Sequence, residues 1–466
     1  MSGNHFARRH YPWALSISVL AERHPRLYIG LALLLMGLGY AFLLLFPALV
    51  FAGATVLVKA LPHVKTAEHW IVVEVWFGIL LFCLFLSQRV FQLQFPRIQG
   101  VKLSKELVPG LFAQLAEARK FTTRPAIRNI VLTDQFELRI EETPRFGYPF
   151  WTSNTLVVGL PLLQTLSQEQ LHGLLMRRLC QYASGRLRPS HWLFRTRLLW
   201  RNYLDALDNK RRFGEAPMRW FFSVYTPLFE LLTLPAARLD ELAADSAALE
   251  WLNDKDYFTA LKSSTIAGIF LDTQYWRKVH QTALKNPAAS LNPFAKLEHI
   301  SGHLKSEAFR GKWLQSAFSA EQDFCSAMPA LRLRMENIGH STLRDVPLVE
   351  QTAAAVCLGD ARKNYVPLID KLWQSTSFVQ WKADYERRRT DIKTVKALSR
   401  KSRQQVLGLR EMLQYARLAR HLRGDSLTRS YAKILKRNLS RLRPSMLLRN
   451  SLPRRLRPEP RANDIF

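Results

Sequence analysis

The stretch LHGLLMRRLCQY, residues 171–182, has the spacing of an apolar helix but contains two adjacent arginines. At 100° per residue its leucines and Tyr182 form one stripe, with Arg178 near the middle and Arg177 and Gln181 together on one flank. A helix of this kind buries its apolar face, so at least one guanidinium points towards the interior. Because a buried cation without a partner is costly, the chain must supply an anion.

The length, charge and cysteine content limit the classes of protein to which the chain can belong. The 466 residues are long enough for two or three domains, and the formal net charge is +30. Much of this charge lies in residues 387–466, which hold 23 Lys and Arg against 5 Asp and Glu. The four cysteines are widely scattered and form no disulfide or zinc-binding spacing, which indicates a reducing compartment.

The N-terminal part predicts a transmembrane hairpin. Residues 27–58 form a run of 32 without a charge, longer than the roughly 20 residues that a spanning helix needs. We expect Pro47 to kink this helix or to mark where it leaves the hydrocarbon. Residues 70–87 form a second, shorter candidate span with Glu74 near its start, for which a soluble core helix is the alternative. Residues 59–69 between them are long enough only for a turn.

Flanking charges predict the topology. The lysines and arginines of the hairpin loop are only Lys59 and Lys65. Basic residues gather outside the two spans, at Arg8, Arg9, Arg23, Arg26, Arg89, Arg97, Lys102 and Lys105. The positive-inside rule then places both termini and the main domain in the cytoplasm and makes this a multi-pass protein of the cytoplasmic (inner) membrane.

The order of elements after the hairpin carries a family resemblance. Residues 105–121 have helical spacing, and 127–140 and 154–163 are β-rich. LSQEQL (166–171) has a capping box, Ser167 with Gln170, and opens the arginine helix. This order resembles the HtpX and CAAX-prenyl-protease-like group of membrane zinc metallopeptidases, the gluzincins. Two later stretches extend the resemblance over roughly residues 28–360: RLDELAAD (238–245), similar to the third-ligand helix, and MPALRLRM (328–335), similar to a later H-P-x-x-x-x-R-I element.

The resemblance implies a zinc site that this chain has lost. The family's helix carries H-E-x-x-H, two zinc-binding histidines around a general base. Here the motif falls on RRLCQ, with Arg177 and Gln181 at the ligand positions and Arg178 at the base. Arginine stays protonated and an amide is a poor zinc ligand, so we expect no zinc, no cofactor and no hydrolysis. We expect His172 and His191 to be ordinary surface or packing residues, His191 reaching the site only by an unusual backbone path.

The same alignment supplies the anion. Glu241, the remaining family ligand position, and Asp245 lie one turn apart and would point at the former zinc position. We expect Arg177 to pair directly with one of them, with Arg178 in a neighbouring role. The alternative is that the arginines reach solvent and Glu241 is a surface residue.

The C-terminal tail is basic and amphipathic. Over 427–442 apolar residues form one stripe, and basic residues crowd the other sides: Lys433, Lys436, Arg437 and Arg441. Such helices bind anionic lipid, nucleic acid or an acidic partner, although a solvated charged tail is the alternative. Residues 443–466, rich in Pro and Arg, have the composition of a disordered segment.

Together these patterns predict a mostly helical α+β protein. Its expected segments are a transmembrane hairpin within 1–95, a gluzincin-like core (96–256), a helical extension (257–386) and the basic tail (387–466). The expected function is that of an inactive pseudo-metallopeptidase, which contacts the bilayer and binds or regulates a membrane protein or peptide through the former substrate groove. Two alternatives remain open: an active metalloendopeptidase with unrecognised ligands, and a membrane-tethered binder of anionic lipid or nucleic acid through the tail.

Overall fold

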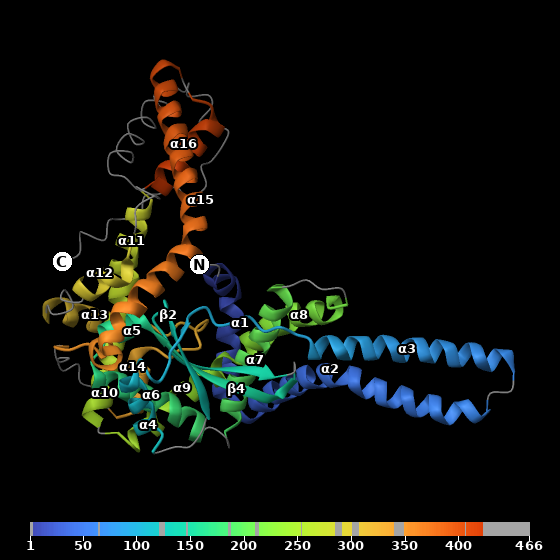
Figure 1. Ribbon diagram of the computed structural model, residues 1–466. Helices are drawn as coiled ribbons and strands as arrows, with labels where there is room; N and C mark the ends of the chain where they lie inside the picture. Colours follow the sequence, from blue (N-terminus) through green and yellow to red (C-terminus); the bar gives the residue numbers. More distant parts are fainter. Residues whose placement is uncertain are drawn as a thin grey trace. The chain divides into compact units, whose positions relative to one another are not determined.

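The structure, a computed structural model, is described here for most of the chain (Figure 1). The residues it describes are 3–63, 66–120, 126–145, 148–184, 188–209, 214–252, 254–284, 291–300, 307–339, 349–405 and 407–422. Within them the chain is mostly helical with a small mixed sheet, which confirms that part of the expectation. It divides into two compact units, residues 1–277 with 292–373 and residues 278–291 with 374–466.

The first unit begins with helix α1 (Gly3–Arg23) and the long hairpin of α2 (Pro25–Ala60) and α3 (Ala67–Phe91). Figure 1 shows α2 and α3 side by side, in blue. Pro25–Ala60 and Trp70–Val90 are each long and apolar enough to cross a membrane. A short 3-10 turn, Leu61–His63, follows α2. Helix α2 continues through Pro47 without ending there.

The sheet lies after the hairpin and has the strand order β1-β2-β4-β3. Its strands are β1 (Val101–Lys102), β2 (Ile127–Thr133), β3 (Leu138–Arg145) and β4 (Tyr148–Gly159). β2 and β4 are parallel, and the outer pairs are antiparallel. The β-rich prediction for 154–163 was wrong at its end, because β4 stops at Gly159 and α5 (Leu160–Thr165) begins there. Pro161 favours this start, since proline fits the first turn of a helix.

Helices make up the rest of the first unit. The predicted capping box is confirmed: Ser167 N donates to Gln170 Oε1 at 3.1 Å, and Gln170 N donates to Ser167 Oγ at 3.3 Å. The helices are α4 (Pro109–Ala118), α6 (Gln168–Ser184), α7 (Pro189–Asn209), α8 (Ala216–Leu232), α9 (Leu234–Leu249), α10 (Asp254–Phe270), α12 (Pro293–Ile300), α13 (Glu307–Ser319) and α14 (Leu331–Asn337).

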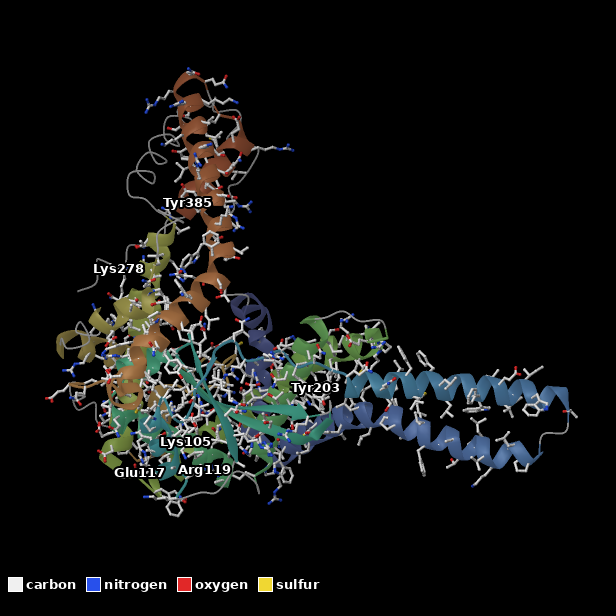
Figure 2. All side chains as sticks on the ribbon, viewed as in Figure 1. Lys105, Glu117, Arg119, Tyr203, Lys278 and Tyr385 are labelled. Atoms are coloured by element: carbon white, nitrogen blue, oxygen red, sulfur yellow. The ribbon has the colours of Figure 1, made fainter. Side chains whose placement is uncertain are left out.

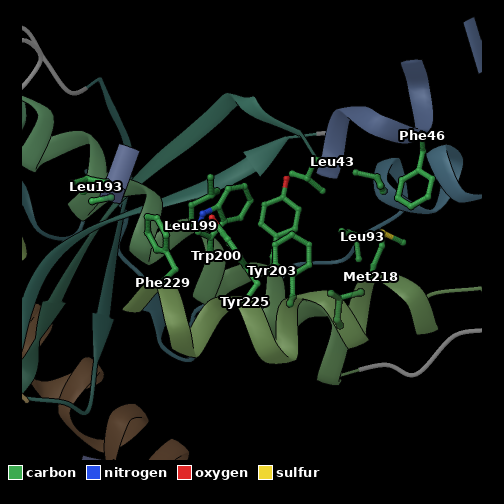
Figure 3. Packing of buried hydrophobic residues seen from close by; sticks show 14 of the residues in the cluster. Leu43, Phe46, Leu93, Leu193, Leu199, Trp200, Tyr203, Met218, Tyr225 and Phe229 are labelled. Atoms are coloured by element: carbon green, nitrogen blue, oxygen red, sulfur yellow. The ribbon is translucent and has the colours of Figure 1, made fainter. Parts of the chain in front are cut away.

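A large apolar cluster joins the base of the hairpin to α7 and α8, as Figure 3 shows. Trp200, Tyr203 and Phe222 are completely buried in it, beside Leu43 of α2 and Leu86 of α3. Tyr203 is labelled at this base in Figure 2. The hairpin is therefore packed against the helical domain at one end.

Further short turns complete the first unit. They are a π-helical turn, Leu271–Tyr275, another at Ala354–Leu358, and a 3-10 turn at Gly359–Ala361. Helix α11 (Trp276–Ala283) begins in the first unit and continues into the second.

The second unit is built on the long helix α15 (Arg362–Gln404), whose first residues belong to the first unit. Helix α16 (Leu409–Leu422) packs on its end around Val395, Leu398 and Tyr415. Lys401 Nζ lies 2.5 Å from Glu411 Oε1 across this contact. The tail residues Lys433, Lys436, Arg437 and Arg441, and the segment 443–466, lie outside the described residues.

Candidate functional site

The candidate site is an ion-pair network between α6 and α9, two helices that pack against each other. Arg177 and Gln181 lie one turn apart on α6, and Glu241 and Asp245 lie one turn apart on α9. All four side chains are buried; Arg177 is 3% exposed and Asp245 is not exposed at all. The spacing of four residues places each pair on one helix face, so the two faces meet as complementary charges.

Arg177 bridges both carboxylates of α9. Its Nε lies 2.5 Å from Asp245 Oδ1, and its Nη2 pairs with the Glu241 carboxylate. The same Nη2 also donates to the backbone carbonyl of Glu241 at 3.2 Å. The predicted pairing of Arg177 with Glu241 or Asp245 is thus confirmed, with one guanidinium engaging both.

Arg178 pairs directly with Glu241 as well, which is more than the neighbouring role expected of it. Its Nη1 lies 3.0 Å from Glu241 Oε1 and donates to Gln181 Oε1 at 2.7 Å. Its Nε donates to the backbone carbonyl of Leu138 at 3.1 Å, at the start of β3. The alternative that both arginines reach solvent and leave Glu241 at the surface is wrong.

Asp245 has two further partners. Arg334 of α14 binds it in a bidentate pair, with Nε–Oδ2 and Nη2–Oδ1 distances both 2.8 Å. The hydroxyl of Tyr257, on α10, donates to Asp245 Oδ1 at 2.5 Å. Arg334 is the second arginine of the stretch MPALRLRM (328–335), whereas Met328, at its start, is 42% exposed.

Asp240 and His191 extend the network and were not predicted as part of it. Gln181 Nε2 donates to Asp240 Oδ2 at 2.8 Å, and His191 Nδ1 lies 3.1 Å from the same oxygen. We expected His191 to reach the site only by an unusual path, but it lies in the first turn of α7 and is 1% exposed. Its ring also packs edge-on against Tyr182, as a packing residue would, but the expectation that it stays away from the site was wrong.

Electrostatics hold this network in its charged form. Burial disfavours a charged Glu241, but Arg177 and Arg178 outweigh burial and lower its pKa well below the usual 4.5. For Asp245 burial acts in the same sense, and Arg177 and Arg334 lower the pKa to about 2. Burial also disfavours the cation of Arg177, yet Asp245 and Glu241 raise its pKa above the usual value. Glu241 and Asp245 therefore stay ionised, and Arg177 stays protonated, near neutral pH.

Side chains of α6 and α7 cap the outer edge of the sheet beside this network. The carbonyls of β3 that point away from β4 accept hydrogen bonds from Arg178 (to Leu138, 3.1 Å), Tyr182 (to Ile140, 3.2 Å) and Asn202 (to Glu142, 3.5 Å). An extended peptide binds a sheet edge through such free carbonyls. At these three positions of β3 the outward carbonyl already accepts a hydrogen bond from a side chain.

An open groove of about 480 Å³ lies along the outward face of α9. Its lining combines apolar and polar side chains: Arg188, Leu239, Leu242, Ala243, Ser246, Ala247, Glu250 and Asn337. Leu239 is 53% exposed there.

The network offers little chemistry of its own. Within the described part of the chain, no group of three or more His, Cys, Asp and Glu side chains is placed to hold a metal ion. Glu241 and Asp245 are each engaged by two arginines, so neither is free to accept a proton from water. Comparisons with protein-family models, with curated proteins and with solved structures gave no match. The function is therefore argued from this geometry.

Proposed function

We propose that the protein is a membrane-anchored, catalytically inactive relative of the HtpX-like zinc metallopeptidases that binds or regulates membrane-protein partners. The observation that carries this proposal is the Arg177 guanidinium, which engages Glu241 and Asp245 together. In active members of that family a zinc ion would sit between such groups. Here a fixed cation supplies the positive charge but has no open coordination position and cannot activate water.

The capped edge of β3 supports the same proposal. A protease that aligns an extended substrate needs main-chain partners, and the outward carbonyls of Leu138, Ile140 and Glu142 are already occupied. The groove along α9 is the surface to which we assign partner binding. Its mixture of leucines with Arg188, Glu250 and Asn337 suits a segment of another protein that is part apolar and part polar.

The hairpin supports membrane anchoring. Both of its helices meet the length and hydropathy of a membrane span, and their outward side chains include many large apolar residues. We assign both termini and the helical domain to the cytoplasmic side of the inner membrane, from the excess of arginine and lysine outside the two spans.

Purified full-length protein in detergent tests the proposal. We expect substoichiometric zinc by elemental analysis and no cleavage of an unfolded model protein, with or without added zinc. Near-equimolar zinc together with chelator-sensitive cleavage would establish an active peptidase instead.

Photo-crosslinking in native membranes tests partner binding. A photoreactive amino acid at Leu239 should give a discrete crosslink to a membrane protein, whereas the same group at Trp251, 52% exposed but not among the groove-lining residues, should not. Equal crosslinking from both positions would contradict the assignment of the groove.

A further inference from the structure

Helix α8 is apolar on two opposite sides. Its inner face is buried in the cluster at the hairpin base, through Met218, Phe222, Tyr225, Thr226 and Phe229. Its outer face carries Trp220, Val224 and Leu228, which are 73%, 61% and 52% exposed. A surface helix of a water-soluble domain places polar residues on that side. The outer stripe therefore requires an apolar environment.

Three contacts fix the direction of α8 relative to α2. The Tyr28 hydroxyl donates to the Leu232 carbonyl at 2.9 Å, and the Tyr225 hydroxyl donates to the Leu35 carbonyl at 2.8 Å. Phe42 stacks on Phe221 with ring centroids 3.8 Å apart. Residue numbers rise along α2 as they fall along α8, so the two helices are antiparallel. The beginning of α8 lies at the hairpin end of this contact.

The length of α3 places the start of α8 within the bilayer. The candidate span Trp70–Val90 has 21 residues. At 1.5 Å per residue it is about 31 Å long, close to the roughly 30 Å of bilayer hydrocarbon. All of it is needed to cross. Yet Leu86 and Val90, near its end, are buried in the same cluster as Phe222, and Gly214 lies directly against Phe85. The hydrocarbon layer must therefore reach the level at which α8 begins.

The exposed flanks of α2 and α8 lie on the same side of the Phe42–Phe221 stack. Viewed along α2 from its N-terminus, Leu38 and Leu45 lie to one side of Phe42. Viewed in the same way along α8, the outer stripe lies to that same side of Phe221. Because the two helices are antiparallel, both sets of side chains then lie on one common side of the helix pair. Leu38 and Leu45 are 51% and 45% exposed, so the two flanks form one apolar surface.

We propose that α8 enters the bilayer beside the hairpin and that its stripe of Trp220, Val224 and Leu228 contacts phospholipid. Trp220, near the start of α8, lies deepest of the three in the hydrocarbon, and Leu228, two turns further on, lies nearest to the membrane–water interface. The far end of α8 is polar, because Glu230 pairs at 2.7 Å with Arg201, whose side chain is 54% exposed. The occupant of the stripe is thus lipid, continuous with the lipid around the hairpin. This inference rests on the proposed membrane anchoring.

Nitroxide labels on the full-length protein test it in vesicles of phosphatidylethanolamine and phosphatidylglycerol. Single cysteines replace Trp220, Val224 or Leu228 in a Cys325→Ser background, whose other three cysteines are buried. Leu81, on α3, serves as the lipid reference, and Leu239, on α9, as the aqueous reference; both are about half exposed, at 48% and 53%. Electron paramagnetic resonance then compares collision with oxygen, which concentrates in hydrocarbon, and with a water-soluble nickel chelate.

At positions 220 and 224 we expect oxygen to outweigh nickel, as at Leu81, with a reversal of the ratio at Leu239 and an intermediate value at 228. A ratio at 220 and 224 equal to that at Leu239 would overturn the inference while leaving anchoring intact. Immobile labels that neither reagent reaches would also overturn it, by assigning the stripe to a protein partner. Nickel exceeding oxygen at Leu81 would overturn the anchoring and this inference together.

Discussion

Arg334 and Asp245, 89 residues apart in the chain, form a buried bidentate ion pair with two nitrogen–oxygen distances of 2.8 Å. Arg177 contacts the same carboxylate from α6, so Asp245 connects α6, α9 and α14. Two guanidinium groups on one carboxylate would repel each other without a second anion. Glu241 supplies it and also binds Arg178, so that three arginines share these two carboxylates. The network therefore behaves as one unit, in which removal of one member leaves the others uncompensated.

Substitution of Glu241 tests how much the ion-pair network contributes to the free energy of unfolding. Glu241→Ala leaves Arg177 and Arg178 buried with an incomplete set of anions, so we expect a loss of about 3–5 kcal/mol in unfolding free energy. Denaturant titration of the detergent-solubilised protein measures it. Glu336→Ala, which removes an exposed ion pair with Arg332, is the matched control and should change the free energy by less than about 1 kcal/mol. Equal losses in the two variants would show that the network adds nothing.

The lowered carboxyl pKa values predict acid sensitivity. Both groups titrate at lower pH in the folded protein than in the unfolded chain, whose values are about 4.5 for Glu241 and 3.8 for Asp245. Their contribution to stability is complete above about pH 4.5 and is lost as the pH falls towards 2, because the unfolded chain then binds more protons. Unfolding free energy measured between pH 6 and pH 3 should fall more steeply in the wild type than in Glu241→Gln. Parallel curves would contradict this assignment.

Much of this site could be predicted from sequence because its geometry follows from helix periodicity. Residues four apart share a face, which was enough to pair Arg177 with Glu241 and Asp245 once the two helices were matched. Asp240 was missed because it precedes Glu241 by only 100° and reads as the flank of that face. The contribution of His191 depends on how α7 starts after the chain leaves α6, which no local pattern specifies.

In the fold, too, local patterns predict local elements but not the contacts between distant segments. The hairpin and the capping box are encoded locally, by an uncharged run and by side chains three residues apart. The capped edge of β3 and the burial of the inner face of α8 are not, since both arise from contacts between distant segments. The end of β4 at Gly159 was misjudged because Leu160–Leu163 continue an apolar run that suits a strand or a buried helix equally well.

Introducing the H-E-x-x-H motif of the zinc metallopeptidases at residues 177–181 tests the proposed relationship. The triple variant Arg177→His, Arg178→Glu, Gln181→His places two imidazoles one turn apart, opposite Glu241, and should bind about one zinc ion per chain. Asp245 keeps Arg334 and Tyr257 as partners in this variant. Elemental analysis after gel filtration measures the metal, and the wild type is the control. A triple variant that keeps the wild-type helical content by circular dichroism but takes up no zinc would contradict the resemblance.

Reporter fusions test the topology. A reporter after residue 466 should indicate the cytoplasm, and one inserted near Pro62 should indicate the opposite side, because the basic residues lie outside the hairpin. Alkaline phosphatase and green fluorescent protein give opposite signals at each position. The reverse pattern would place the helical domain outside the cytoplasm.

Gly39 tests how the hairpin is attached to the helical domain. A Cβ atom at this position would lie 2.5 Å from the Tyr225 hydroxyl and 2.9 Å from the Trp200 ring, inside any real contact distance. Tyr225 has little room to move, because its hydroxyl bonds the Leu35 carbonyl and its ring stacks on Phe221. Gly39→Ala should therefore force α2 away from α7 and α8 and cost about 1–3 kcal/mol.

Gly37 is the matched control for Gly39, two residues earlier on the same helix, with nothing within 4 Å of its Cβ position. Gly37→Ala should leave stability unchanged or raise it by up to about 1 kcal/mol, because alanine is the better helix former. Thermal unfolding of both variants in the same detergent separates packing from helix propensity. Equal melting temperatures would mean that α2 does not pack on α8 through this face, and the level assigned to α8 in the bilayer would lose its support.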